Sequence, residues 1–162
     1  MLHTFIFDLD DTVIDSSHRQ RILPNGDIDL AHWRRFNTAK NILADSLLPL
    51  AEQMRHAIRD GLDVAIMTSR VMGHADRVFL NIHGLLAPSI YSRSPSDLRG
   101  AGELKLAKMH EMAIDRGWSF ADLRKRVVMW DDSKDVQKTL KNAGFRVIDP
   151  VNFNNQAIKE AI

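Results

Sequence analysis

The chain has no cysteine among its 162 residues, which excludes disulfide bonds, thiolate metal sites and thiol catalysis. It also has no apolar run that approaches the ~20 residues of a membrane-spanning helix. Its N-terminus lacks the basic segment and long apolar stretch of a secretion signal. We therefore expect an intracellular, cytoplasmic protein, and the length suits a single domain over residues 1–162.

Neither sign of charge is in excess, because Lys and Arg total 22 and Asp and Glu total 21. A net charge of +1 argues neither for nor against nucleic acid as a partner, since a local basic rim can be hidden in a neutral total. Hydrophobic residues make up 44% of the sequence and charged residues 27%, which is typical of a globular domain. Composition alone therefore leaves the function open.

Short apolar segments alternate with helical patterns along most of the chain. The apolar segments are rich in β-branched and aromatic residues and predict buried strands, whereas each helical pattern ends close to a glycine. This alternation predicts an α/β fold of Rossmann type, a parallel sheet with helices on both faces. The predicted strands cover residues 3–7, 63–67, 89–91, 127–130 and 145–148, and the predicted helices cover 47–60, 103–116 and 134–142.

Carboxylates are crowded directly after the first predicted strand, in the stretch FDLDDT. Further polar groups follow other strands, and the carboxyl ends of parallel strands share one edge of a sheet. Carboxylates brought together there would raise one another's pKa unless a cation intervened, and Mg²⁺ binds through carboxylates and substrate phosphate. A D-x-D or DD pair alone is often a solvated turn, but the joint pattern predicts a metal site. The residues expected to converge are Asp8, Asp10, Thr68, Ser69, Arg70, Lys105, Asp131 and Asp132.

These motifs resemble those of the haloacid dehalogenase superfamily of phosphotransferases, over about residues 5–149. The resemblance implies that Asp8 is a nucleophile that forms an aspartyl-phosphate, and that Asp10 is the acid and base, with a pKa raised by neighbouring carboxylates. It implies that Thr68 and Lys105 bind the phosphoryl group. Asp8, the Asp10 carbonyl and Asp132 would hold Mg²⁺, with Asp131 behind them. Asp11, where many of these phosphatases have glycine, is expected to be a turn residue.

A closer resemblance is to the phosphatase domain of polynucleotide kinase/phosphatases, which heal 3′ ends. That domain has arginines at the offsets of Arg19 and Arg70, and its S-G-R motif reads Thr68-Ser69-Arg70 here. Its D-x-R-x₅-K stretch matches Asp97, Arg99 and Lys105, although Ala101 stands where it has aspartate. The resemblance implies substrate contacts by Arg19, Ser69, Arg70 and Arg99. No G-x-x-x-x-G-K-[ST] loop is present, so any kinase or ligase activity would come from a separate partner.

A polar, irregular insert at about residues 16–45 stands where many relatives carry a much larger cap domain. An open site admits a large substrate, so we expect an Mg²⁺-dependent phosphomonoesterase that removes 3′-phosphate from nucleic-acid ends, either DNA or RNA. The alternatives are a phosphatase of nucleotides or other small phosphate esters, and a non-catalytic phosphate-binding protein. Within the insert, Trp33 and Phe36 would either stack on a base or, as we favour, pack a helix on the sheet.

Overall fold

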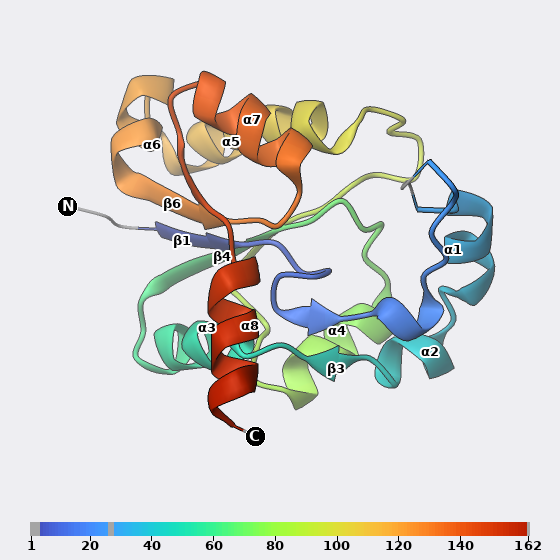
Figure 1. The fold of residues 1–162 in the computed structure, drawn as a ribbon. Helices are drawn as coiled ribbons and strands as arrows, with labels where there is room; N and C mark the ends of the chain where they lie inside the picture. Colours follow the sequence, from blue (N-terminus) through green and yellow to red (C-terminus); the bar gives the residue numbers. More distant parts are fainter. Residues whose placement is uncertain (1–3, 26–27, 162) are drawn as a thin grey trace.

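The computed structural model describes residues 4–25 and 28–161, and its centre is a five-stranded parallel sheet (Figure 1). The strand order is β5-β4-β1-β6-β7, so β1 lies in the middle with β4 and β6 as its parallel neighbours. This confirms the predicted α/β class. The strands are β1 (Thr4–Phe7), β4 (Asp63–Met67), β5 (Ser89–Tyr91), β6 (Val127–Trp130) and β7 (Arg146–Ile148). The predicted first strand also included His3, which lies outside the described residues.

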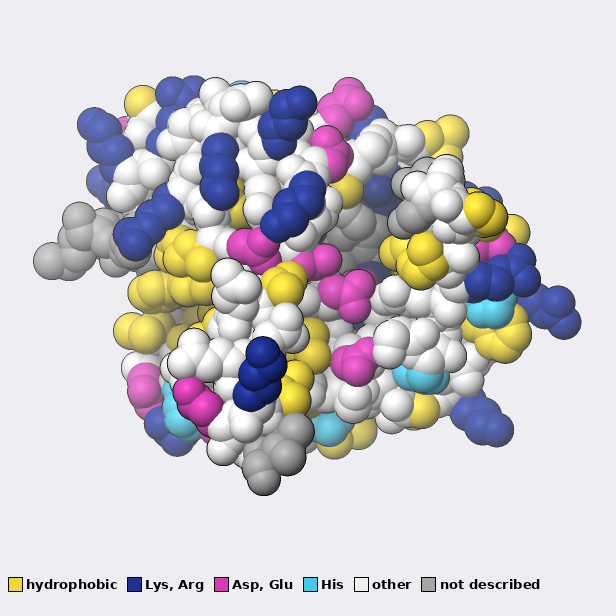
Figure 2. Space-filling model, viewed as in Figure 1, with side chains coloured by type: hydrophobic (Ala, Val, Ile, Leu, Met, Phe, Trp, Pro, Cys, Tyr) yellow, Lys and Arg dark blue, Asp and Glu magenta, His cyan; other side chains and the backbone are white. Residues whose placement is uncertain are grey.

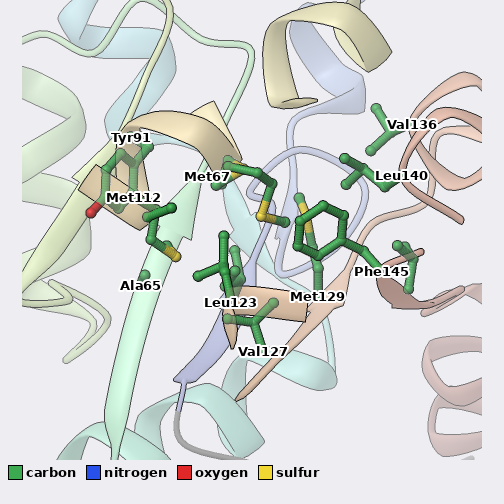
Figure 3. Close-up of a cluster of buried hydrophobic side chains, with 14 residues drawn as sticks. Ala65, Met67, Tyr91, Met112, Leu123, Val127, Met129, Val136, Leu140 and Phe145 are labelled. Atoms are coloured by element: carbon green, nitrogen blue, oxygen red, sulfur yellow. The ribbon is translucent and has the colours of Figure 1, made fainter. Parts of the chain in front are cut away.

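Helices cover both faces of the sheet (Figure 1). Successive strand residues point to opposite sides, so Ala65 and Met67 belong to one buried cluster and Val64 and Ile66 to the other. Figure 3 shows the first cluster, in which Met67 and Met129 meet side chains from the helices. That face is covered by α5 (Ala101–Arg116), α6 (Phe120–Arg126) and α7 (Lys134–Asn142), and the other by α3 (Leu50–Arg59), α4 (His74–Ile82) and α8 (Val151–Glu160).

Most predicted boundaries agree with the structure to within two residues. Three strands and α7 begin and end at the predicted residues, whereas the helix predicted over 47–60 begins only at Leu50. The reason is that Leu47 pairs with Ile14 in a short antiparallel ribbon formed by β2 (Ile14–Asp15) and β3 (Ser46–Leu47). Outside the insert, α4, α6 and α8 lie beyond the three predicted helix ranges. No helix in the described part of the chain is both long and apolar enough to span a membrane.

The insert grows out of the β2–β3 ribbon and is not irregular, so that prediction was wrong. It contains a 3₁₀ turn, η1 (Ser17–Arg19), and two short helices, α1 (Leu30–Phe36) and α2 (Ala39–Leu43). Asp29 and Thr38 cap these helices by accepting hydrogen bonds from the backbone N–H groups of His32 and Asn41. No residue of α1 is buried, so the expected packing of Trp33 and Phe36 on the sheet was also wrong.

Candidate active site

Three polar residues come one position after three neighbouring strands, and backbone pairing aligns them along one edge of the sheet. The N–H of Asp8 donates to the carbonyl of Trp130 at 3.0 Å, and that of Thr68 donates to the carbonyl of Tyr91 at 2.9 Å. The N–H of Asp131 donates to the carbonyl of Ile148 at 3.1 Å. These bonds extend the ladders beyond the strand ends, so the backbone position of each polar residue is set by the sheet.

The stretch after Asp8 is a tight loop around one carbonyl group. The carbonyl of Leu9 accepts hydrogen bonds from the N–H groups of Val13 and Ile14 at 3.0 and 2.9 Å. Asp11 adopts a left-handed conformation with φ 57°, a region that glycine enters most easily. This confirms that Asp11 is a turn residue at a position suited to glycine.

Lys105, one turn into α5, joins the ends of two strands. Its Nζ lies 2.8 Å from Oδ1 of Asp8 and 2.5 Å from Oδ2 of Asp131, and its side chain is only 2% exposed. Burial alone would lower the pKa of Lys105, but the charges of Asp8 and Asp131 outweigh it and hold the pKa above its usual value. The side chain is therefore an ammonium group at neutral pH.

Three carboxylates surround this position with more negative charge than Lys105 can balance. One oxygen from each of Asp8, Asp131 and Asp132 lies within 4.8 Å of the others. Burial raises the pKa of Asp8 well above its usual value. Burial, together with the charge of Asp131, raises the pKa of Asp132 to about 6. Such crowding is relieved by a cation, so this group of carboxylates is suited to hold a metal ion.

The two outer members of this group differ in how their oxygens are used. Asp131 is fully buried, and its oxygens accept from Lys105 and from the backbone N–H of Ser133 at 3.0 Å. Asp132 is partly exposed and accepts a hydrogen bond from the hydroxyl of Thr12 at 3.3 Å. A supporting position for Asp131 behind Asp8 and Asp132 stays a prediction. Acidic side chains gather near the middle of the face in Figure 2.

Asp10 is held by an arginine rather than by the carboxylate group. Arg70 donates from Nε to Oδ2 and from Nη2 to Oδ1, both at 2.7 Å, and the Ser16 hydroxyl donates to Oδ1 at 2.6 Å. Burial would raise the pKa of Asp10, but the charge and hydrogen bonds of Arg70, with the Ser16 bond, lower it below its usual value. The expectation of a pKa raised by neighbouring carboxylates was therefore wrong.

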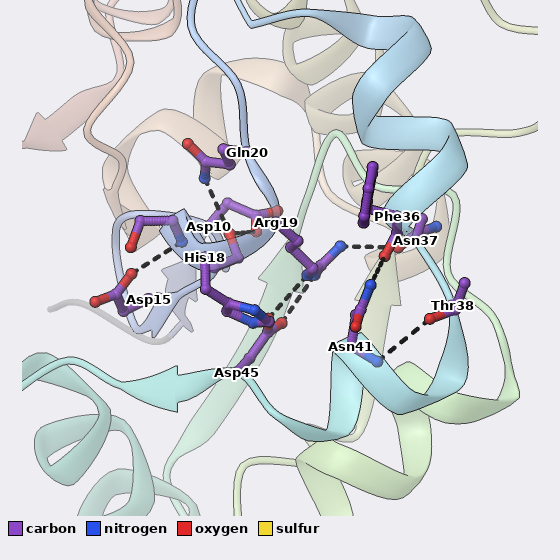
Figure 4. Close-up of polar contacts among 12 residues, drawn as sticks. Asp10, Asp15, His18, Arg19, Gln20, Phe36, Asn37, Thr38, Asn41 and Asp45 are labelled. Atoms are coloured by element: carbon purple, nitrogen blue, oxygen red, sulfur yellow. Dashed lines mark hydrogen bonds and ion pairs between the residues drawn. The ribbon is translucent and has the colours of Figure 1, made fainter.

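Arg19 and Arg70, predicted to contact phosphate, are instead engaged by protein groups. All three guanidinium nitrogens of Arg70 donate to Asp10, Asp45 or Asp76. Those of Arg19 donate to Asp45 and Asn37, and Figure 4 shows this contact between η1 and the end of the insert. Both arginines are buried. In this structure both arginines therefore bind carboxylate or amide groups of the protein. Direct contact of Arg19 or Arg70 with phosphate stays a prediction.

Trp33 belongs to this same group of side chains. Its ring lies 4.2 Å from the guanidinium carbon of Arg19 and 6.0 Å from that of Arg70, which is a cation–π arrangement. Phe36 stacks on His32 and is exposed. The helix α1 therefore lies over the arginines beside Asp10.

The loop after β4 holds the other two predicted residues of the T-S-R motif. Thr68 is buried and its hydroxyl oxygen accepts from the N–H of Arg70 at 3.1 Å. The hydroxyl oxygen of Ser69 is shielded from solvent and has no hydrogen-bond partner among the described residues. Because β4 and β1 are neighbours, Thr68 lies beside Asp8 at the edge of the sheet. The hydroxyl group of Ser69 is available to form a hydrogen bond with a ligand.

Arg99 lies in the loop that leads into α5 and is not drawn into the buried group. It pairs with Asp97 at 2.6 Å, and 41% of its side chain is exposed. The loop is organised by Arg93, which donates to the carbonyls of Ser69, Asp97 and Arg99. The predicted substrate contact of Arg99 stays a prediction.

Several residues that shape the site were not identified from the sequence. Asp45 and Asp76 hold Arg70, and Asp76 also caps α4 through the N–H of Gly73, a G-x-x-D pattern that was readable at the start of that helix. Asn154 on α8 donates to the carbonyl of Thr12 and accepts from the N–H of Leu50, both within 3.0 Å. No local signal marks Asp45 or Asn154, because their partners are remote in sequence.

Comparison with known families places the chain firmly. The family model described as bacteriophage T5 5′-deoxynucleotidase matches residues 1–159, nearly the whole chain. No curated protein sequence is significantly similar to the chain.

Solved structures share the fold at low sequence identity. A haloacid dehalogenase-like hydrolase from Streptococcus pneumoniae aligns with a TM-score of 0.66 and 14% identity, over 91% of this chain and 84% of its own. A predicted phosphoglycolate phosphatase from Haemophilus somnus aligns with a TM-score of 0.63 and 14% identity, over 91% and 84%. The Pnkp1/Rnl/Hen1 RNA repair complex contains a chain that aligns with a TM-score of 0.57 and 19% identity, over 91% of this chain but only 42% of its own. The chain belongs to the bacteriophage T5 5′-deoxynucleotidase family and is a phosphoric monoester hydrolase with the haloacid dehalogenase fold.

Proposed function

We propose that the protein is an Mg²⁺-dependent phosphatase that removes the 5′-phosphate of deoxynucleoside monophosphates. The observation that carries the proposal is the family match over residues 1–159, which includes every residue of the strand-end site. The contact of Lys105 with Asp8 and Asp131 supports it, because a buried ammonium group beside the attacking carboxylate can also bind the oxygens of the phosphoryl group that this carboxylate attacks. The nucleotide phosphatase that the sequence offered only as an alternative thus becomes the first candidate.

In the first step, a carboxylate oxygen of Asp8 attacks phosphorus, with Thr68 and Lys105 binding the phosphoryl oxygens. The bond from phosphorus to the 5′ oxygen of the sugar breaks, and that oxygen takes a proton from Asp10. Because Arg70 and Ser16 lower the pKa of Asp10 in the free site, Asp10 has to take up this proton when the negatively charged substrate binds beside it. The products are the deoxynucleoside and an aspartyl-phosphate at Asp8. A carboxylate is a competent nucleophile toward phosphorus when cations neutralise the phosphoryl oxygens.

In the second step, Asp10 takes a proton from water as the water oxygen attacks phosphorus. The bond from phosphorus to the Asp8 oxygen breaks, which releases inorganic phosphate and restores the Asp8 carboxylate and the protonated Asp10. The same residue therefore acts first as acid and then as base. The hydrogen bonds from Arg70 and Ser16 fix the direction in which Asp10 presents its carboxyl group.

The carboxylate group is where Mg²⁺ would bind, held by Asp8, Asp132 and the carbonyl of Asp10, with Asp131 behind them. The surplus of negative charge there, seen in the raised pKa values of Asp8 and Asp132, supports this assignment. When bound, the ion supplies neutralisation of the charge on the phosphoryl oxygens.

A second candidate is removal of 3′-phosphate from nucleic-acid ends. It is favoured by the sequence offsets of Arg19 and Arg70 and by the likeness to a chain of an RNA repair complex. A separate kinase or ligase would then act on the same ends. The engagement of both arginines by carboxylates speaks against it, because neither is available to grip an extended substrate.

The experiment is a phosphate-release assay with Mg²⁺ over a panel of substrates at matched concentrations. The panel contains deoxynucleoside 5′- and 3′-monophosphates, ribonucleoside 5′-monophosphates, 3′- and 5′-phosphorylated oligonucleotides, and a phosphopeptide. We expect the highest kcat/KM for a deoxynucleoside 5′-monophosphate. A preference for the 3′-phosphorylated oligonucleotide would establish the second candidate, and no release from any substrate would favour the non-catalytic alternative.

A further inference from the structure

The side chain of Asp45, the last residue of the insert, is completely buried and accepts hydrogen bonds from two arginines, Arg19 and Arg70. Its Oδ1 accepts from Nε of Arg19 at 2.8 Å and lies 2.9 Å from Nε2 of His18. Its Oδ2 accepts from Nη2 of Arg19 at 2.8 Å and from Nη2 of Arg70 at 3.2 Å. Figure 4 shows His18 and Arg19 meeting this carboxylate, with Asp10 close by. Asp45 therefore joins the insert to the arginine that holds Asp10.

Arg70 is held from three directions at once. Nη1 donates to Asp76 at 2.8 Å and Nη2 donates to Asp45, while Nε and Nη2 form the fork onto Asp10. A planar guanidinium group that is fixed on three carboxylates cannot rotate without breaking charge-assisted hydrogen bonds. The orientation of Asp10 thus depends on Asp45 through Arg70, although Asp45 itself has no hydrogen bond to Asp10 among those of the described residues.

A contribution to the stability of the fold does not by itself explain why Arg70 and its three carboxylate partners are brought together. Burying ion pairs costs desolvation that often cancels the attraction, so apolar side chains of similar size would stabilise the fold as well. A fixed geometry for Asp10 is a reason that apolar side chains could not satisfy. We propose that Asp45 is a positioning residue, which acts through Arg70 to hold Asp10 in the direction needed to transfer a proton to the leaving oxygen.

This inference rests on the proposed function only for the role of Asp10, and it predicts a dependence on the leaving group. A sugar alkoxide leaves only if it receives a proton, whereas p-nitrophenolate leaves readily without one. A misplaced Asp10 should therefore slow hydrolysis of the nucleotide much more than hydrolysis of p-nitrophenyl phosphate. A general loss of structure would slow both substrates alike.

The experiment compares Asp45→Asn with wild type on a deoxynucleoside 5′-monophosphate and on p-nitrophenyl phosphate. Asparagine keeps the shape and an acceptor but removes the charge. We expect kcat/KM for the nucleotide to fall by roughly 10- to 100-fold, and that for p-nitrophenyl phosphate to change by less than about threefold.

The matched control is Asp63→Asn. Asp63 accepts a fork from Arg116, at 2.7 and 2.8 Å, but it begins β4 whereas the site lies beyond the other end of that strand. This variant loses a forked arginine–aspartate pair that is partly exposed, and it should leave the ratio of the two rates unchanged. Rates are measured below the unfolding midpoint of every variant.

If Asp45→Asn does not fold, Arg19→Gln is the variant that tests the inference. Arg19 has no hydrogen bond to Asp10 among those described, so it should shift the ratio in the same direction by a smaller factor. Equal losses on both substrates, or none, in the folded variant would overturn the inference. Failure of the proposed function is a separate result, namely a wild-type protein that ignores nucleotides. In that case the rate on p-nitrophenyl phosphate is compared with the rate on whichever alkyl phosphate of the substrate panel the wild-type protein hydrolyses.

Discussion

Nζ of Lys105 lies 2.8 Å from Oδ1 of Asp8, so a helix and a strand that are distant in sequence meet at one buried ion pair. Asp131 completes the contact from a third element. Every role proposed for the strand-end residues depends on this meeting point, because it brings together the proposed nucleophile, the proposed phosphate-binding cation and the carboxylates proposed to bind the metal ion. The predictions below test its parts separately.

Asp8→Asn should lower kcat by on the order of 10³-fold or more, because the amide is not nucleophilic and the side chain sits at the reacting centre. It should not lower the unfolding midpoint, since burial already raises the pKa of this carboxyl group and a neutral amide avoids that cost. Steady-state rates and a thermal unfolding curve check both parts. Retention of more than a few per cent of activity would remove Asp8 from the nucleophile role.

Lys105→Met should destabilise the fold in a pH-dependent way. Without the ammonium group, the pKa of Asp8 in the folded state would rise further above its unfolded value. A group with a raised folded pKa contributes stability at low pH that is lost as the pH rises through that pKa. The loss relative to wild type should approach about 3–5 kcal/mol at alkaline pH and shrink as the pH falls below the raised pKa of Asp8.

Thermal unfolding in EDTA at several pH values measures this difference. Lys108→Met is the matched control on the same helix, because Lys108 pairs with Glu111 near the surface. Its effect should be small and the same at every pH. An equal deficit of Lys105→Met at low and high pH would mean that the buried carboxylates are not what Lys105 compensates.

Removal of divalent cations should stop turnover, and Mg²⁺ should restore it. Asp132→Asn should raise the Mg²⁺ concentration for half-maximal activity by roughly tenfold or more, the range typical of weakened metal sites. Asp60→Asn is the control, since Asp60 is exposed and pairs only with Arg59 in the described structure. An enzyme that is indifferent to EDTA would contradict the assignment of the carboxylate group to a metal ion.

Asn154→Ala should destabilise the protein by about 2–5 kcal/mol, because it leaves the N–H of Leu50 and the carbonyl of Thr12 without buried partners. Asn152→Ala, at an exposed position on the same helix, should have little effect. Denaturant unfolding compares the two variants. Equal stability of both would show that α8 does not fasten the loop that follows Asp8.

The strands and the strand-end residues could be predicted because their signals are local. An apolar run such as 127–130 that ends in two aspartates defines both the strand and the place of its carboxylates. In the insert, α1 was considered only as a helix that carries Trp33 and Phe36. The helix α2 was missed although Thr38 is an ordinary cap residue, because its apolar periodicity is too short to detect. The helix α6 likewise begins with an S-x-x-D pattern at Ser119.

The roles of the arginines could not be predicted from spacing. Arg70 and Asp10 are 60 residues apart, and only the fold shows that the guanidinium group turns inward to Asp10. The lowered pKa of Asp10 follows from that contact and was therefore predicted in the wrong direction. Asp45 lies in a polar segment without periodicity, so its burial appears only when the insert closes on the ribbon of β2 and β3.

The central claim is that phosphate passes from a deoxynucleoside 5′-monophosphate to water through Asp8. The most direct measurement is to mix enzyme, Mg²⁺ and this substrate, quench with sodium borohydride, and map the product by peptide mass spectrometry. Borohydride reduces an acyl phosphate but not a free carboxylate, so the account predicts conversion of Asp8 to homoserine, dependent on substrate and absent in Asp8→Asn. Reduction at another residue, or turnover of the nucleotide with Asp8 never modified, would contradict it.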